Sequence, residues 1–449
     1  MLRMKKINKL FIALLFFVSV SCDSFLELTP VNIISDSEVI VDRNSAYAAV
    51  LGLYSRLQVA GLYGNQIPLN SGVLSDELTH SGSFPTIRDL DNSATQASNV
   101  TTQATWQQAY TGIYQANIIL EALGGSSTIP NLTADERKVF LAEAKFLRAF
   151  LHFELLNLWG GVPIATTTSL AVLRTLPRSS VEDCYSFIKT EMNAVIPDLV
   201  GVNNGAFRIN QWAVKGILAR VHLYSGDLNS AATLANDVIV NSGYKLQTNY
   251  PDLFGTPGAG ADENIWKIFF SANDQSGIPF QVLPAGRFEF AVSPQLMAAY
   301  NEFPGDTRRM VVQNEGDPQG RFATTKYPDL ATGTSPTIMV RLAEMYLIRA
   351  EATVSTNNLQ ATADVNELRK RAKVAEYGSV NLDLILNERF VELAVEGHRW
   401  NDIRRTNRAD AIMSAINPDN WTPQKALLPI PQYEINQNPS LKDAQNPGY

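Results

Sequence analysis

An apolar stripe along residues 133–161 constrains the fold more than any other feature of this sequence. Thr133 and Glu136 have the spacing of a capping box, and the segment Gly160–Pro163 supplies a stop signal. The apolar positions between these signals recur every three or four residues: Phe140, Ala144, Leu147, Leu151, Leu155 and Leu158. That spacing places them on one face of an α-helix. The sequence therefore predicts a long helix whose wide apolar face packs against a core.

Shorter amphipathic patterns predict further helices, some of them joined as hairpins. Residues 46–57 and 106–123 repeat the helical spacing. Residues 210–240 hold two helical patterns joined by a short connection at 225–227, so the two helices must pack antiparallel. A similar pair is expected at residues 338–373. Such pairs resemble tetratricopeptide units, whose repeat is about 34 residues long, although here they are scattered rather than tandem. One hairpin cannot bury its own apolar face, so we expect the hairpins to stack.

Helical periodicity fades in two long stretches, residues 59–104 and 247–336. Glycine and proline recur in the second stretch, and residues 264–270 have the composition of a strand. No Gly/Ser tract, proline repeat or charge block divides the chain into domains. We therefore expect one mostly α unit with long loop excursions that contain minor β-structure. Loops on a rigid helical frame are where binding groups usually lie.

The first residues have the order of a secretory signal peptide, which we place at residues 1–21. Four cations precede an apolar run from Leu10 to Val20, and Ser21 comes directly before Cys22. The run spans about 11 residues, too few for a membrane-spanning helix, which needs about 20. Cys22 stands where a bacterial lipoprotein is cut and lipidated, so we predict that it carries a lipid anchor. Ser19 replaces the usual leucine of that cleavage site, which leaves an incidental cysteine as the alternative.

Charge and cysteine content exclude some classes of function. The chain carries 37 Lys and Arg against 44 Asp and Glu, a net charge of −7 at pH 7. Nucleic acid binding needs a basic surface, so we expect no nucleic acid partner. The only cysteine besides Cys22 is Cys184, so lipidation of Cys22 leaves no intrachain disulfide. Stability must then come from an ordinary apolar core.

The sequence motifs of common catalytic sites are absent. The chain has no phosphate-binding glycine motif, no HExxH, no CxxC and no Gly-x-Ser-x-Gly. Its histidines are dispersed: His80, His152, His222 and His398. We therefore predict no catalytic residue, no metal site and no cofactor. Aspartate-rich loops can bind calcium without a recognisable spacing, so calcium binding stays open.

Glu388, Glu392 and Glu396 follow one another at four-residue spacing within residues 386–405, the most charged stretch of the chain. Paired carboxylates could supply the acid and the base of a glycosidase. Glutamate three or four residues from arginine is also the ordinary pattern of a salt-bridged helix face. We favour this structural interpretation and keep a surface glycan hydrolase as the alternative.

Short motifs along the whole mature chain are similar to those of one protein family. They are CDSFLELTP at residues 22–30, AKFLRA at 144–149, WGGVP at 159–163, RLAEMYL at 341–347, EGHRWNDIR at 396–404, LPIP at 428–431 and QNPGY at 445–449. In this order they resemble the SusD/RagB family of outer-membrane nutrient-binding lipoproteins. The motifs lie in the predicted frame and at the ends of the chain, so the resemblance does not assign the residues that contact ligand.

The resemblance implies a SusD-like nutrient-binding domain over residues 22–449, with tetratricopeptide-like hairpins in a helical frame. It implies a lipid anchor in the outer membrane and exposure at the cell surface. It also implies a partner, a SusC-like TonB-dependent transporter, over which the lipoprotein sits as a lid and to which it passes its ligand. Oligosaccharides are the usual cargo, with peptides in the RagB branch, and the sequence leaves the cargo open.

We expect the ligand face where residues 76–106 and 266–303 meet. An aromatic ring can stack on the apolar face of a sugar while neighbouring polar groups bind its hydroxyls. The candidate contacts are Asp76, Glu77, Phe84, Arg88, Trp266 and Phe288. Core packing is the alternative for each aromatic residue. A scaffold that holds proteins and binds no small ligand is the remaining functional alternative.

Overall fold

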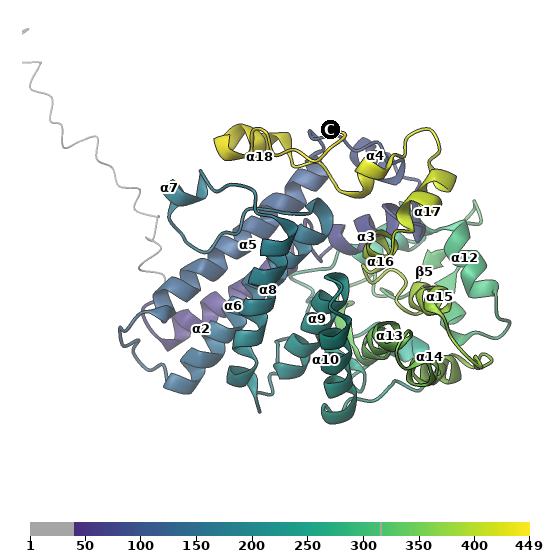
Figure 1. Ribbon diagram of the computed structural model, residues 1–449, viewed down its shortest axis with the longest axis horizontal. Helices are drawn as coiled ribbons and strands as arrows, with labels where there is room; N and C mark the ends of the chain where they lie inside the picture. The colour runs from purple at the N-terminus through teal and green to yellow at the C-terminus, as the bar shows by residue number, and fades with distance from the viewer. Residues whose placement is uncertain (1–39, 315–316) are drawn as a thin grey trace, which may run out of the picture.

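Helices form the frame of the protein in the computed structural model, which describes residues 40–314 and 317–449 (Figure 1). Four long helices lie together in the N-terminal half: α2 (Arg43–Leu57), α5 (Val100–Gly124), α6 (Ala134–Trp159) and α8 (Val181–Val195). The shorter α7 (Leu170–Leu173) and η3 (Pro197–Leu199) flank α8 in sequence. Helix α6 packs against α2, α5 and α8. The mostly α fold predicted from the sequence is confirmed.

The membrane-related predictions concern the start of the chain. The predicted signal peptide, residues 1–21, and the predicted lipidation site, Cys22, lie outside the described residues. Within residues 40–314 and 317–449, every helix is too short or too polar to cross a bilayer.

Helix α6 follows the predicted pattern at both ends. The Thr133 hydroxyl accepts a hydrogen bond from the Glu136 N–H at 3.2 Å, and the Glu136 carboxylate accepts one from the Thr133 N–H. Gly160 ends the helix with a φ of +75°, which glycine adopts without strain. The apolar stripe is buried as far as Leu155, but so are the carboxylates of Glu143 and Glu154. The helix is therefore enclosed on more sides than its stripe predicts.

Two helical hairpins pack against each other, as the sequence spacing predicts. They are α9 (Gln211–Tyr224) with α10 (Leu228–Asn241), and α13 (Leu342–Thr353) with α14 (Asn358–Ala372). Helix α10 packs along α13 and joins the two hairpins (Figure 1). The predicted start of the second hairpin at residue 338 is wrong. Thr337–Arg341 form strand β6 instead, because their β-branched side chains suit a strand that pairs with a neighbour.

The charged stretch 386–405 is two helices rather than one continuous helix. Helix α15 (Leu382–Glu392) ends before a sharp turn in which Val395 and Gly397 have positive φ, and α16 (Arg399–Arg405) begins after it. The remaining C-terminal elements are α17 (Ala409–Ile416), η6 (Pro423–Ala426), α18 (Gln432–Gln437) and η7 (Pro439–Leu441). This segment returns over the N-terminal helices, with α18 lying near α5 and α7 (Figure 1). The Trp159 indole N–H donates to the Pro429 carbonyl at 2.8 Å.

The two loop-rich regions contain short elements and meet at a strand pair. The first contains α3 (Gln66–Val73), β1 (Leu78–His80) and α4 (Pro85–Asp91). The second contains η4 (Tyr250–Leu253), β2 (Asn264–Ile268), α11 (Ile278–Val282), β3 (Phe290–Val292), α12 (Pro294–Asn301), η5 (Thr307–Val311), β4 (Val312–Gln313) and β5 (Ala323–Thr324). Strand β1 pairs antiparallel with β3, β2 with β6, and β4 with β5. Minor β-structure in the loop regions is therefore confirmed, including a strand within residues 264–270.

Candidate functional site

The pairing of β1 with β3 brings the two loop regions together, with His80 opposite Phe290. A cavity of about 260 Å³ lies beside this pair. Its walls come from both regions: Asn65, Gln66, Asn70, Phe84, Thr86, Ile87 and Thr101 from the first, and Gln281, Arg287, Glu289 and Phe290 from the second. The two regions meet as expected from the sequence, although residues 100–106 belong to helix α5 rather than to a loop.

An aromatic ring and an ion pair lie at the rim of this cavity. Phe84 is 45% exposed, and the Arg287 guanidinium lies 4.6 Å from the centre of its ring. Arg287 also donates a hydrogen bond to the buried carboxylate of Glu289. The cation–π contact and the ion pair together restrict the Phe84 ring at the surface. The rim thus offers an exposed, oriented aromatic surface beside charged groups.

Two amide side chains on the cavity wall have unused hydrogen-bonding capacity. Asn70 is only 8% exposed, and its Oδ1 accepts no hydrogen bond from the described residues. The Oε1 atom of Gln281 is likewise buried without a donor in the same part of the chain. A buried polar atom without a partner costs about 1–3 kcal/mol. A ligand that rearranges these amides and supplies hydroxyl donors would relieve that cost.

His80 lies behind the cavity as a buried ring. Burial lowers the pKa of His80, and the nearby Arg88 and Arg287 lower it further, against the opposing effect of Glu289. Its Nε2 is 4.0 Å from the Glu289 carboxylate. The ring therefore stays neutral at pH 7, and the cavity presents one carboxylate, one guanidinium and several uncharged polar groups.

Phe84 and Arg88 are the two predicted contacts that the structure places at the surface near this cavity. Trp266 is a correction, because it is fully buried in β2 with its ring 5.5 Å from Phe146 and 5.2 Å from Phe150. A ligand cannot stack on a ring that α6 covers. Phe288 is also buried, with the Arg321 guanidinium 4.4 Å from its ring centre. Core packing, the alternative interpretation, describes both of these aromatic residues.

Asp76 and Glu77 are buried as well, so neither is a surface contact in this structure. Asp76 forms a two-bonded ion pair with Arg399, at 2.6 and 2.7 Å. The Glu77 Oε1 accepts the Val395 N–H at 3.2 Å. Both carboxylates therefore attach the first loop region to the turn between α15 and α16. Their contacts position β1 rather than a ligand.

Glu77 should make the stability of the protein depend on pH. Burial raises the pKa of Glu77 from 4.5 to about 8, so the folded protein holds a proton that the unfolded chain releases above pH 4.5. The stability that this proton supplies is complete below pH 4.5 and is lost as the pH rises towards 8. Replacing Glu77 with Gln keeps an oxygen for the Val395 N–H and removes the titration. The free energy of unfolding of Glu77→Gln minus that of the wild type should therefore rise by about 2–3 kcal/mol from pH 5.5 to pH 7.5.

Urea unfolding of both proteins at the two pH values measures this difference. Comparing the two proteins at each pH cancels the other titrating groups. A difference that does not change with pH would mean that the pKa of Glu77 is ordinary.

The sequence analysis missed Asn70, Gln281, Arg287 and Glu289, which form much of the cavity wall. All four lie within the predicted loop regions. Arg287 and Glu289 stand two residues apart just before β3 and form an ion pair across Phe288, which has a positive φ of 48°. The alternation of charged and aromatic residues in Arg-Phe-Glu-Phe at residues 287–290 was a signal for Arg287 and Glu289, whereas no sequence pattern identifies Asn70 or Gln281.

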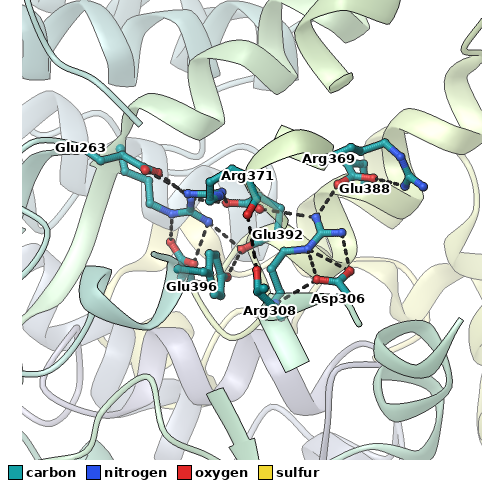
Figure 2. Close-up of polar contacts among 12 residues, drawn as sticks. Glu263, Asp306, Arg308, Arg369, Arg371, Glu388, Glu392 and Glu396 are labelled. Carbon is teal, nitrogen blue, oxygen red and sulfur yellow. Dashed lines mark hydrogen bonds and ion pairs between the residues drawn. The ribbon is translucent and has the colours of Figure 1, made fainter. Parts of the chain in front are cut away.

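Glu388, Glu392 and Glu396 belong to a buried cluster of charges (Figure 2). Their partners come from other segments rather than from helical neighbours, which corrects the predicted helix face. The cluster contains five carboxylates and five cations among the described residues: Glu263, Asp306, Glu388, Glu392 and Glu396 with Arg308, Lys326, Arg341, Arg369 and Arg371.

This burial removes the basis of the hydrolase alternative. Burial alone would raise the pKa of Glu392, but Arg371, Arg341 and Arg308 outweigh burial and hold that pKa well below its ordinary value. A carboxyl group that stays ionised and fully buried cannot protonate a glycosidic oxygen. Within the described residues, no group of three or more His, Cys, Asp or Glu side chains has the arrangement of a metal site.

Comparisons with known proteins agree with one another. A model described as "SusD family" matches residues 298–449, and one described as "Starch-binding associating with outer membrane" matches residues 28–223. A SusD-like protein of Formosa agariphila is 27% identical over 98% of this chain and 99% of its own length. The starch-binding protein SusD of Bacteroides thetaiotaomicron is 25% identical over 69% of this chain and 72% of its own length.

Solved structures of similar fold agree with the sequence comparisons. A putative sugar binding protein from Bacteroides vulgatus superposes with a TM-score of 0.80 at 25% identity. The match covers 92% of this chain and 99% of that protein.

Proposed function

The chain belongs to the SusD/RagB family, and on this premise we propose that it captures a glycan at the outer membrane and delivers it to a transporter. The observation that carries the proposal is the cavity between the two loop regions. Phe84 offers an aromatic surface at its rim, and Asn70, Gln281 and Glu289 offer acceptors on its wall.

The chemistry of a sugar suits this arrangement. The C–H face of a pyranose ring packs on an aromatic plane, and its hydroxyls donate to amide and carboxylate oxygens. The family description and the names of the relatives support a glycan as the ligand, since they refer to starch and to sugar. An oligosaccharide or polysaccharide is therefore the cargo class that we propose.

Delivery of the glycan to a transporter requires that the protein be held at the outer membrane beside that transporter. We propose that Cys22 carries a lipid anchor in the outer membrane and that the domain is exposed at the cell surface. The partner in this proposal is a SusC-like TonB-dependent transporter, which the family resemblance implies. Replacing Cys22 with Ala should release the protein from membranes, and affinity purification of the anchored protein should recover a barrel partner. Purification without any such partner would argue against delivery.

Phe84 should be the side chain whose removal weakens glycan binding most. Replacing Phe84 with Ala removes the stacking surface at the rim, and we expect affinity to fall about tenfold, or roughly 1.4 kcal/mol. Phe269 provides a control of similar exposure, because it is 42% exposed in the other loop-rich region, residues 247–336, and does not line the cavity. Phe269→Ala should bind as the wild type does.

The measurement uses the soluble chain from Asp23 onwards. Affinity electrophoresis on laminarin and soluble starch, followed by calorimetry with the matching hexasaccharides, gives the affinities of the three proteins. Product analysis runs alongside. If both variants lose the same affinity, or if Phe84→Ala loses none, the glycan does not bind at this cavity. Turnover of the polysaccharide would contradict the proposal that the protein only binds it.

A further inference from the structure

A second and larger hollow of about 600 Å³ lies on another side of helix α5. We call it the α5 groove. Its floor is α5 from Trp106 to Asn117, and its walls are residues 163–176 and residues 434–441. Neither wall contributes to the cavity at Phe84, and the two hollows have no lining residue in common.

An aromatic row follows the floor of the α5 groove. Trp106, Tyr110 and Tyr114 stand four residues apart, which places them along one face of the helix. Trp106 is buried beneath the floor, with its ring centre 5.2 Å from that of Tyr110, and the half-buried Tyr110 and Tyr114 form the accessible part of the row. The exposed side chains of Thr111 and Gln437 and the half-buried carboxylate of Glu434 lie around this row. Such an apolar floor, with hydroxyl and amide groups, the Glu434 carboxylate and Arg174 around it, suits a ligand with flat C–H faces and many hydroxyls.

Hydrogen bonds hold both walls of the groove in place. The Tyr110 hydroxyl donates to the Pro163 carbonyl at 2.8 Å, and the Asn117 amide donates to the Ala165 carbonyl at 3.1 Å. On the other wall, the Gln107 amide donates to Glu434 at 2.9 Å. Asn438, which is buried, donates to the Leu176 carbonyl at 2.8 Å and ties the two walls together. The groove is therefore preformed, which reduces the entropy lost when a ligand binds.

The groove and the cavity lie on opposite sides of one helix. Thr101 lines the cavity, and Tyr110 lines the groove nine residues later. Nine residues correspond to roughly 14 Å along the helix axis and to two and a half turns, which reverses the direction of the side chain. Two segments of one long polymer can thus reach the same protein molecule. Occupation of both hollows would raise the apparent affinity for a polymer above that for a short chain.

We propose that the α5 groove is a second glycan-binding site, which holds another segment of the polysaccharide bound at Phe84. This inference rests on the proposed function of the chain as a glycan-binding protein. The protein then has two sites for a short oligosaccharide and binds a long polymer through both.

Stoichiometry tests the proposal directly. Calorimetry with laminarihexaose or maltohexaose should give two molecules bound per wild-type protein. Phe84→Ala should weaken the cavity site about tenfold and leave the groove site unchanged, and Tyr114→Ala should weaken the groove site and leave the cavity site unchanged. Thr111→Arg offers a second test, since Thr111 is exposed and an arginine there fills the groove without disturbing the core. Both groove variants should weaken binding of the parent polymer, laminarin or soluble starch, about tenfold.

Tyr433→Ala is the matched control, because Tyr433 is exposed on α18 beside the groove but does not line it. It should keep two sites. If the wild type binds one hexasaccharide per molecule and Phe84→Ala weakens that binding, the groove is not a glycan site and the proposed function stands. Groove variants with unchanged stoichiometry and polymer affinity would do the same. Binding of neither glycan would contradict both.

Discussion

Replacing Arg341 with Met should lower the free energy of unfolding by about 3–5 kcal/mol. The Arg341 guanidinium is buried and contacts three carboxylates, with nitrogen–oxygen distances of 2.5 Å to Glu392, 2.8 Å to Glu396 and 3.0 Å to Glu263. Methionine preserves much of the volume but removes the charge. The three carboxylates would then be buried without enough positive charge to balance them, and this uncompensated charge accounts for the lower free energy of unfolding.

Loss of Arg341 should affect several elements, because the buried charge cluster joins them. Arg341 ends β6, Glu392 ends α15, and Glu263 precedes β2. Arg371, on α14, contacts both Glu263 and Glu392. The ion pairs therefore attach the second hairpin to the loop region that carries part of the cavity wall.

Urea unfolding at pH 7 measures the expected loss. Arg43→Met is the control, because the Arg43–Glu136 pair is at the surface, where water screens the charges, and it should change stability far less. A loss in Arg341→Met no greater than in the control would mean that water reaches the cluster. Glu392→Gln should also change the free energy of unfolding in this assay. Product analysis tests the hydrolase alternative separately, and we expect no glycan turnover by the wild type or by Glu392→Gln.

Replacing Trp266 with Ala should also destabilise the protein by about 3–5 kcal/mol. Its indole is fully buried and meets Phe146 and Phe150 edge to face, so alanine leaves a large cavity between β2 and α6. Phe269→Ala, three residues later and exposed, should stay within about 0.5 kcal/mol of the wild type.

Trp266→Phe separates packing from ligand binding, because phenylalanine refills much of the space. It should fold, with a smaller loss of stability, and should bind laminarin or soluble starch as the wild type does. Thermal unfolding and affinity electrophoresis give the two results. A stable Trp266→Phe protein without glycan affinity would restore Trp266 as a ligand contact.

Local signals in the sequence determined much of the helical frame. Helix α6 begins at the predicted capping box and ends at the predicted glycine, because both signals act through backbone hydrogen bonds within a few residues. The first hairpin follows for the same reason, since its short connection leaves no other packing. The strand β6 was missed because five residues are too few for periodicity to distinguish a strand from a helix.

The candidate site depended on tertiary structure for most of its residues. Phe84 and Trp266 are both aromatic residues in loop-rich sequence. Helix α6 covers Trp266, whereas Phe84 is exposed. Glu392 has the spacing of a helix-face residue, but its partners Arg308 and Arg341 are 84 and 51 positions away in the chain. Local sequence thus determined which segments are helical and which are loops. Burial and charge pairing were decided by contacts between distant segments, because those contacts determine whether water or another side chain surrounds each group.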